Sequence, residues 1–120
     1  MNLKEYADKA KRTLAELGND FADELHMVIG MVTESAELID VYKKHLAYSK
    51  KMDYVNMQEE IGDLMWYLIN FCTLMGWDLE NILEANIHKL ETRYPEKFTE
   101  QDANVRDLGK ERTTLEDKLL

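Results

Sequence analysis

The sequence has few residues that interrupt helices and few that suit an exported or membrane protein. It holds one proline and five glycines in 120 residues, which favours long helices over strands and turns. The single cysteine, Cys72, excludes an internal disulfide and lies in an apolar run typical of a small buried side chain. No apolar stretch is long enough for a signal-peptide core or a membrane span. We therefore expect a cytoplasmic protein without membrane contact.

Positive charge is also scarce. Lysine and arginine number 15 against 24 aspartates and glutamates, which gives a formal net charge of −9. This balance excludes a sequence-independent binder of nucleic acid polymers, because such a protein needs a basic surface. A hydrophobic content of 45% provides enough apolar material for one modest core. We expect one folded domain.

The spacing of apolar residues and caps predicts four helices joined by short polar turns. The second of them ends in a polar turn over residues 45–53, and beyond residue 96 the apolar density falls. We predict an all-α, four-helix bundle-like domain over residues 1–98, and a C-terminal arm over residues 99–120 with a short helix near 113–119. The predicted boundaries are Asn2 to Gly18, Asn19 or Asp20 to the polar turn, Asp53 or Asn56 to Gly76, and Asp78 to Tyr94-Pro95.

The second predicted helix is apolar on two sides, which is typical of a helix packed between others. Two long helices of this kind leave more apolar surface than so short a chain covers by itself, so we expect a homodimer or homotetramer built on helices two and three. One stripe, expected to face the core, is Phe21, Leu25, Val28, Val32, Ile39 and Leu46, and the other is Met27, Met31, Leu38 and Val41.

Two short acidic phrases predict a metal site. Glu34 and Glu37 are three residues apart, as are Glu60 and Asp63, so each pair lies on one face of its helix. Glu37 and Asp63 are each thirteen residues from Lys50 in the polar turn, so the two pairs face each other if the chain doubles back there. Four converging carboxylates repel one another and are costly to desolvate unless a cation binds them.

The ligand types favour magnesium, with Mn²⁺ as an alternative. Magnesium prefers oxygen ligands, keeps several waters and is often shared between carboxylates and phosphates. Helical di-iron sites use Glu-x-x-His pairs, and no histidine here follows a glutamate at that spacing; zinc is disfavoured by the lack of nitrogen and sulfur ligands. The competing interpretation is a non-catalytic helical interaction module whose acidic faces point to solvent.

Four segments carry a family resemblance. They are residues 30–38 (GMVTESAEL), Lys43-Lys44, residues 59–68 (EEIGDLMWYL) and residues 86–95 (NIHKLETRYP). They resemble the MazG-type nucleotide pyrophosphohydrolases, all-α enzymes related to dimeric dUTPases and phosphoribosyl-ATP pyrophosphohydrolases, over about residues 20–98. Thr33 stands where the family phrase often has a further glutamate.

The resemblance implies Mg²⁺-dependent hydrolysis of a nucleoside triphosphate between the α and β phosphates, with a dUTPase-like or phosphoribosyl-ATP-cleaving specificity as alternatives. The metal ligands are then Glu34, Glu37, Glu60 and Asp63, and either Glu34 or Glu37 activates the attacking water. The expected substrate contacts are Lys43, Lys44, Lys89 and Arg93 to phosphates, Tyr67 (or Trp66 or Trp77) to the base, and Asn70 and Asn86 to the sugar or metal-bound water.

Each of these substrate contacts also has a purely structural interpretation. Lys43 and Lys44 suit the negative end of the second helix. Lys89 and Arg93 can form ordinary ion pairs with nearby acids such as Glu84 or Glu96. Aromatic side chains such as Tyr67 are common in helical cores. The polar stripe that carries several of these residues is Asn56, Glu60, Asp63, Tyr67 and Asn70, beside the apolar face of the third helix.

Overall fold

The computed structural model describes all 120 residues and contains helices but no strands. This confirms the predicted all-α class. No helix combines the length and the apolar character that crossing a membrane requires. The elements are α1 (Leu3–Ala10), the 3₁₀ turn η1 (Lys11–Thr13), α2 (Asp20–Tyr48), α3 (Tyr54–Met75), α4 (Leu79–Arg93), α5 (Glu100–Asn104) and α6 (Leu108–Leu119).

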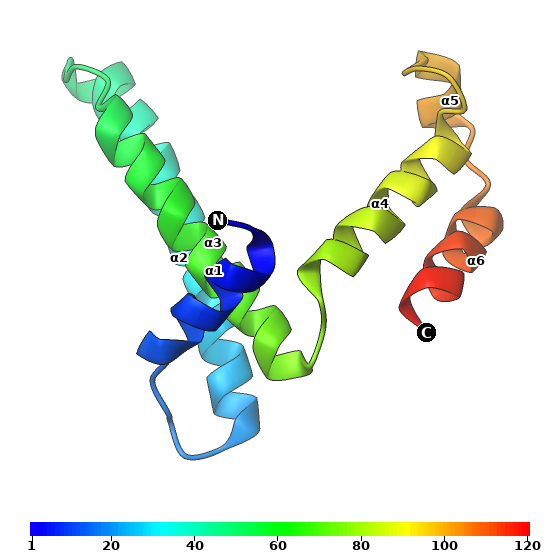
Figure 1. Cartoon of the computed structure of the whole chain (residues 1–120). Coiled ribbons are helices and arrows are strands. Elements are labelled where there is room, and N and C mark those ends of the chain that lie inside the picture. Colours follow the sequence, from blue (N-terminus) through cyan, green and yellow to red (C-terminus); the bar gives the residue numbers. More distant parts are fainter. The chain divides into compact units, whose positions relative to one another are not determined.

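The chain forms two compact units, Met1–Gly76 and Trp77–Leu120. In the first, α2 and α3 pack along each other as an antiparallel hairpin, and α1 lies against α3 (Figure 1). In the second, α6 packs along α4. The segment expected to be an arm thus contributes two helices, and its last helix begins earlier than predicted. The division into residues 1–98 and 99–120 stays a prediction.

Capping residues set the start of α2 and both ends of the turn between α2 and α3. The Asn19 side chain accepts the backbone N–H of the third following residue at 2.8 Å and begins α2. Ser49 ends α2 in the left-handed conformation, at φ 53°. Asp53 accepts the N–H of Asn56 at 2.9 Å and begins α3. Of the two candidate caps predicted for each helix, the earlier is the one used.

The first helix is shorter than predicted, and side-chain hydrogen bonds, one of them from α3, hold the segment that follows it. The Thr13 hydroxyl donates to the Ala10 carbonyl at 3.1 Å and accepts from the Trp66 indole N–H at 3.1 Å. These bonds hold η1 against α3. Further along, the backbone N–H of Leu17 donates to the Asp23 carboxylate at 2.8 Å instead of continuing a helix.

The face of α2 that packs inside the first unit is the second predicted stripe. Met27 is 1% exposed and Val41 is buried, while Ile69 of α3 is 2% exposed. The first stripe was expected to face the core, and this expectation is wrong. A single antiparallel partner covers only one side of α2, so the members of the first stripe are 39% to 88% exposed: Phe21, Leu25, Val28, Val32, Ile39 and Leu46.

A glycine sets the spacing between α2 and α3. Gly30 is buried, and a Cβ atom built on it would lie 2.1 Å from a ring carbon of Tyr67. Only a residue without a side chain therefore leaves room for this ring. Gly30 lies one turn before Glu34, and Tyr67 lies one turn after Asp63, so the close approach is next to the acidic residues.

Candidate metal centre

Three carboxylates converge between α2 and α3. One oxygen from each of Glu34, Glu37 and Glu60 lies within 4.8 Å of the others. Glu34 and Glu37 lie on adjacent turns of α2, and Glu60 comes from α3, which packs against it. Oxygens bound to one Mg²⁺ are roughly 3–4 Å apart. Small side-chain rotations would therefore bring all three groups to a single ion, as predicted for two acidic phrases facing across the turn.

The burial of the cluster supports a bound cation. Glu60 is 6% exposed, Glu34 is half-buried and Glu37 is exposed. The Oε2 atoms of both Glu34 and Glu60 are buried without a hydrogen-bond partner. The other oxygen of Glu60 accepts from the Asn56 amide at 2.9 Å. A buried carboxylate oxygen without a donor is costly, and an all-oxygen donor set of this kind fits a hard divalent cation.

The pKa values of Glu34 and Glu37 show that these carboxylates are crowded and that their negative charges repel one another. Burial, followed by a hydrogen bond with Glu60 and repulsion from Glu37 and Asp63, raises the pKa of Glu34 to about 7. A hydrogen bond with Glu60 and the charge of Glu60 raise the pKa of Glu37. A site that retains protons this tightly also attracts a divalent cation, which relieves the same repulsion.

Asp63 stands at the edge of this cluster. It is exposed and is not one of the three converging groups. Its negative charge nevertheless raises the pKa values of Glu34 and Glu37, and that of Tyr6 in α1 after the larger effect of burial. Asp63 is therefore within electrostatic reach of the cluster. The charge of Asp63 also links α1 to this site, which the sequence did not indicate.

Aromatic and amide side chains follow the acidic residues along the hairpin. The Tyr67 ring meets the Trp66 ring edge-on at a centroid distance of 4.9 Å and the His26 ring at 5.9 Å. Asn70 is fully buried, and neither atom of its amide has a hydrogen-bond partner. His26 Nδ1 is likewise buried and unpartnered. Next to the carboxylates the hairpin thus contains unsatisfied polar atoms among aromatic rings.

The helices that hold this cluster also carry the family match. A family model for the MazG nucleotide pyrophosphohydrolase domain matches residues 22–98. The chain belongs to the MazG family. The matched range contains the three clustered carboxylates and all of α3 and α4, and it ends before α5. Searches of curated proteins and of solved structures gave no match.

The two lysines at the end of α2 form local ion pairs. Lys43 and Lys44 contact Asp40 at 3.3 and 3.0 Å, and both lysines are exposed. Hydrogen bonds and charge from these lysines lower the pKa of Asp40. Exposed pairs of this kind contribute little to stability, so both lysines can exchange Asp40 for another anion at small cost.

The three MazG motif residues on α4 differ in their surroundings. Asn86 is exposed, and Lys89 is half-buried without an ion pair. Arg93 donates to Glu111 of α6 through Nε at 2.7 Å and Nη2 at 3.2 Å. The structural interpretation offered nearby acids such as Glu84 or Glu96 as ion-pair partners, but Arg93 instead pairs with Glu111, eighteen positions further along the chain and in the same compact unit. No local sequence signal indicates that pairing.

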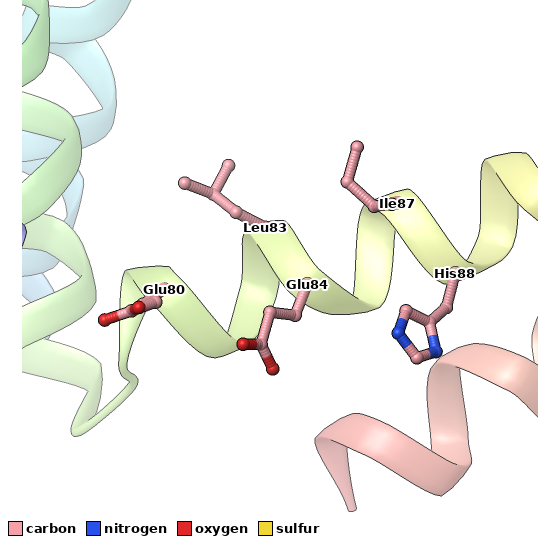
Figure 2. A pocket seen from close by; sticks show the side chains of 5 residues that line it. All are labelled: Glu80, Leu83, Glu84, Ile87 and His88. Atoms are coloured by element: carbon pink, nitrogen blue, oxygen red, sulfur yellow. The ribbon is translucent and has the colours of Figure 1, made fainter.

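Two hollows are found on the surface of this MazG chain. One, of about 390 Å³, is on α4 and is lined by Glu80, Leu83, Glu84, Ile87 and His88. Leu83 and Ile87 point to one side of the helix, and Glu84 and His88 point to another (Figure 2). The other, of about 720 Å³, is bordered by most of residues 11–20 together with Asp23, Thr73 and Leu74. Neither is lined by the three clustered glutamates.

Proposed function

We propose that the protein is a Mg²⁺-dependent nucleoside triphosphate pyrophosphohydrolase that converts a nucleoside triphosphate into the monophosphate and pyrophosphate. The observation that carries this proposal is the convergence of Glu34, Glu37 and Glu60, with two buried and unpartnered oxygens, in a chain of the MazG family. Bringing three carboxylates together, one of them buried, is costly for a helical scaffold unless a cation binds them.

The proposed metal ligands are Glu34, Glu37 and Glu60, with Asp63 as a fourth group that binds the ion or its waters. When bound, the cation neutralises charge on the phosphates and polarises their oxygens. Mn²⁺ is the alternative metal, since it accepts the same oxygen ligands. The donor set contains no nitrogen or sulfur, so zinc fits it poorly.

The proposed chemistry needs one proton acceptor among the carboxylates. A water oxygen attacks the α-phosphorus, the bond to the bridging oxygen breaks, and pyrophosphate leaves with the bonding electrons. The proton of the water passes to Glu34 or Glu37. Glu37 is exposed and Glu34 is half-buried, so Glu37 is the more accessible of the two to water. Both residues remain candidates for the base.

The proposed substrate contacts follow the MazG motif residues and the hairpin's polar stripe. Cationic side chains bind the phosphates, and arginine can donate two hydrogen bonds at once. The Tyr67 ring stacks on the base, and the amides bind the sugar or metal-bound water. In full, we propose Lys43, Lys44, Lys89 and Arg93 for the phosphates, Tyr67 for the base, and Asn70 and Asn86 for the remaining polar contacts.

The decisive assay is a panel of ribo- and deoxyribonucleoside triphosphates, including dUTP, together with phosphoribosyl-ATP. Each is incubated with Mg²⁺, and pyrophosphate and orthophosphate are measured separately. We expect pyrophosphate release that EDTA abolishes. Release of single phosphates would show that a different bond is cleaved. A folded protein that releases neither product would support the non-catalytic helical module.

A matched pair of variants connects the activity to the cluster. Glu60→Gln keeps the shape of a buried ligand and removes its charge, and we expect it to lower kcat by at least about 100-fold. Glu59→Gln changes the exposed neighbouring residue and should stay within about twofold of the original activity. In EDTA, Glu60→Gln should melt no lower than the original protein, because it relieves repulsion within the cluster.

A further inference from the structure

A second buried carboxylate lies beyond the MazG-matched residues. Glu111 of α6 is 4% exposed. Its oxygens accept two hydrogen bonds from Arg93, at 2.7 and 3.2 Å, and two from Arg106, at 3.4 and 2.5 Å. These bonds lower the pKa of Glu111 to about 2. One ionised carboxylate thus binds two guanidinium groups, and the cluster keeps a net positive charge.

The contact fixes the orientation of Arg93. Glu111 occupies the edge formed by Nε and Nη2 and leaves the Nη1 amino group unused by this pair. The guanidinium carbon lies 5.7 Å from the centre of the Tyr94 ring, and the Arg93 side chain is only 16% exposed. A planar guanidinium held along one edge points its remaining N–H groups in a defined direction.

Glu111 is not needed merely to attach α6 to α4. The Asn81 amide donates to the Lys118 carbonyl at 3.1 Å, and the hydroxyls of Thr92 and Thr114 lie 3.3 Å apart. These contacts join the same two helices without charge. Apolar residues usually stabilise a packed interface as well as a buried ion pair does. The two hydrogen bonds from Arg93 to Glu111 therefore need an explanation other than the attachment of α6 to α4.

We propose that Glu111 is a positioning residue for Arg93, holding the guanidinium so that N–H groups not bonded to Glu111 donate to a polyphosphate anion. This inference rests on the proposed function, in which Arg93 contacts the substrate phosphates. A long side chain that is already ordered loses less conformational entropy when the anion binds. Without the carboxylate, the Arg93 side chain must become ordered when the anion binds. We expect this to weaken binding of the anion about tenfold.

The test compares Glu111→Gln with Arg106→Gln, which removes the other arginine of the cluster and leaves Arg93 paired. We expect Glu111→Gln to raise KM for the triphosphate about tenfold with kcat within about threefold, and to weaken Mg²⁺-tripolyphosphate binding about tenfold in calorimetry. Arg106→Gln should lower the melting temperature and leave both constants within about threefold. In an Arg93→Gln background, Glu111→Gln should change KM no further.

Three results would overturn the positioning role. The first is an unchanged KM in Glu111→Gln, and the second is an equal change of KM in Glu111→Gln and Arg106→Gln. The third is tighter tripolyphosphate binding in Glu111→Gln, which would mean that the carboxylate competes with the anion for Arg93. If Glu111→Gln does not fold, Arg93→Lys replaces it, because lysine keeps the charge but cannot be held along a planar edge. Arg93→Lys with the original KM would equally reject the proposal.

The calorimetric readout separates this inference from the proposed function. A protein that hydrolyses no triphosphate, yet binds tripolyphosphate more weakly after Glu111→Gln, would refute the proposed reaction and support the positioning role. A protein that hydrolyses triphosphates but binds tripolyphosphate independently of Arg93 would support the reaction and refute the positioning role.

Discussion

At the residue scale, the sequence predicted the acidic cluster because helical spacing and one turn were sufficient. Two pairs three residues apart, at equal distances from Lys50, were expected to converge when the chain folds back. Glu34, Glu37 and Glu60 do so, whereas Asp63 stays at the edge of the cluster. The contact between Arg93 and Glu111 could not be found in this way. Eighteen residues separate the two, and only the packing of α6 on α4 brings them together.

The raised pKa of Glu34 predicts how the metal-free protein responds to pH. Its value of about 7 in the fold, against an ordinary 4.5, means that the folded state binds this proton more tightly than the unfolded state. The stabilisation is fully present below about pH 4.5 and is lost as the pH rises through 7. In EDTA, we expect the melting temperature of the original protein to fall by a few degrees more than that of Glu34→Gln as the pH rises across this window.

Magnesium should reverse this trend. The cation binds the ionised cluster and stabilises only the folded state, so its effect on the melting temperature should grow from pH 5 to pH 8. Scanning calorimetry at matched ionic strength with Mg²⁺ or EDTA measures both effects. If the melting temperatures of the original protein and of Glu34→Gln depended on pH in the same way, with or without Mg²⁺, the neighbouring carboxylates would not repel the charge of Glu34.

At the element scale, the caps were predictable and the ends set by tertiary contacts were not. Asn19 and Asp53 begin their helices through bonds to the next turn, which depend on local sequence alone. The end of α1 depends on the hydrogen bond from Trp66 to Thr13, residues 53 positions apart. The exposed stripe of α2 was misassigned for a similar reason, since periodicity shows that a face is apolar but not what covers it.

Two glycines give opposite predictions for the same substitution. Gly30→Ala places a methyl group 2.1 Å from the Tyr67 ring, and we expect the overpacking to cost about 1–3 kcal/mol, more than the gain in helix propensity. Gly62→Ala meets no atom within 4 Å and should stabilise α3 by about 0.5–1 kcal/mol. Urea unfolding with unchanged m-values measures both. Equal effects at the two positions would disprove the close approach of α2 and α3.

At the scale of the whole molecule, composition predicted the fold class but not the organisation. Few prolines and glycines, with apolar residues at helical spacing, are enough to predict an all-α protein. The division into units at Gly76 is not visible in composition. The MazG match crosses this division, taking α2 and α3 from the first unit and α4 from the second. The family match therefore does not follow the boundary between the two compact units.

The exposed stripe of α2 leads us to propose self-association. Burying one such side chain contributes about 1.5–3 kcal/mol, so a shared face with Phe21, Val32 and Ile39, 73%, 67% and 67% exposed, would offset the cost of bringing two copies together. The net charge of −9 per chain opposes this contact. Moderate salt screens that repulsion and should strengthen the assembly.

Light scattering after size exclusion tests the assembly directly. We expect a species of at least twice the chain mass of 14.1 kDa, as a homodimer or homotetramer. Ile39→Glu places a charge within the proposed face and should shift the protein toward the single-chain mass, whereas Val105→Glu, at a site 74% exposed on the C-terminal segment, should not. A monodisperse single chain at micromolar concentration and moderate salt would show that the stripe of α2 does not join two copies, and a second chain would then contribute nothing to the site.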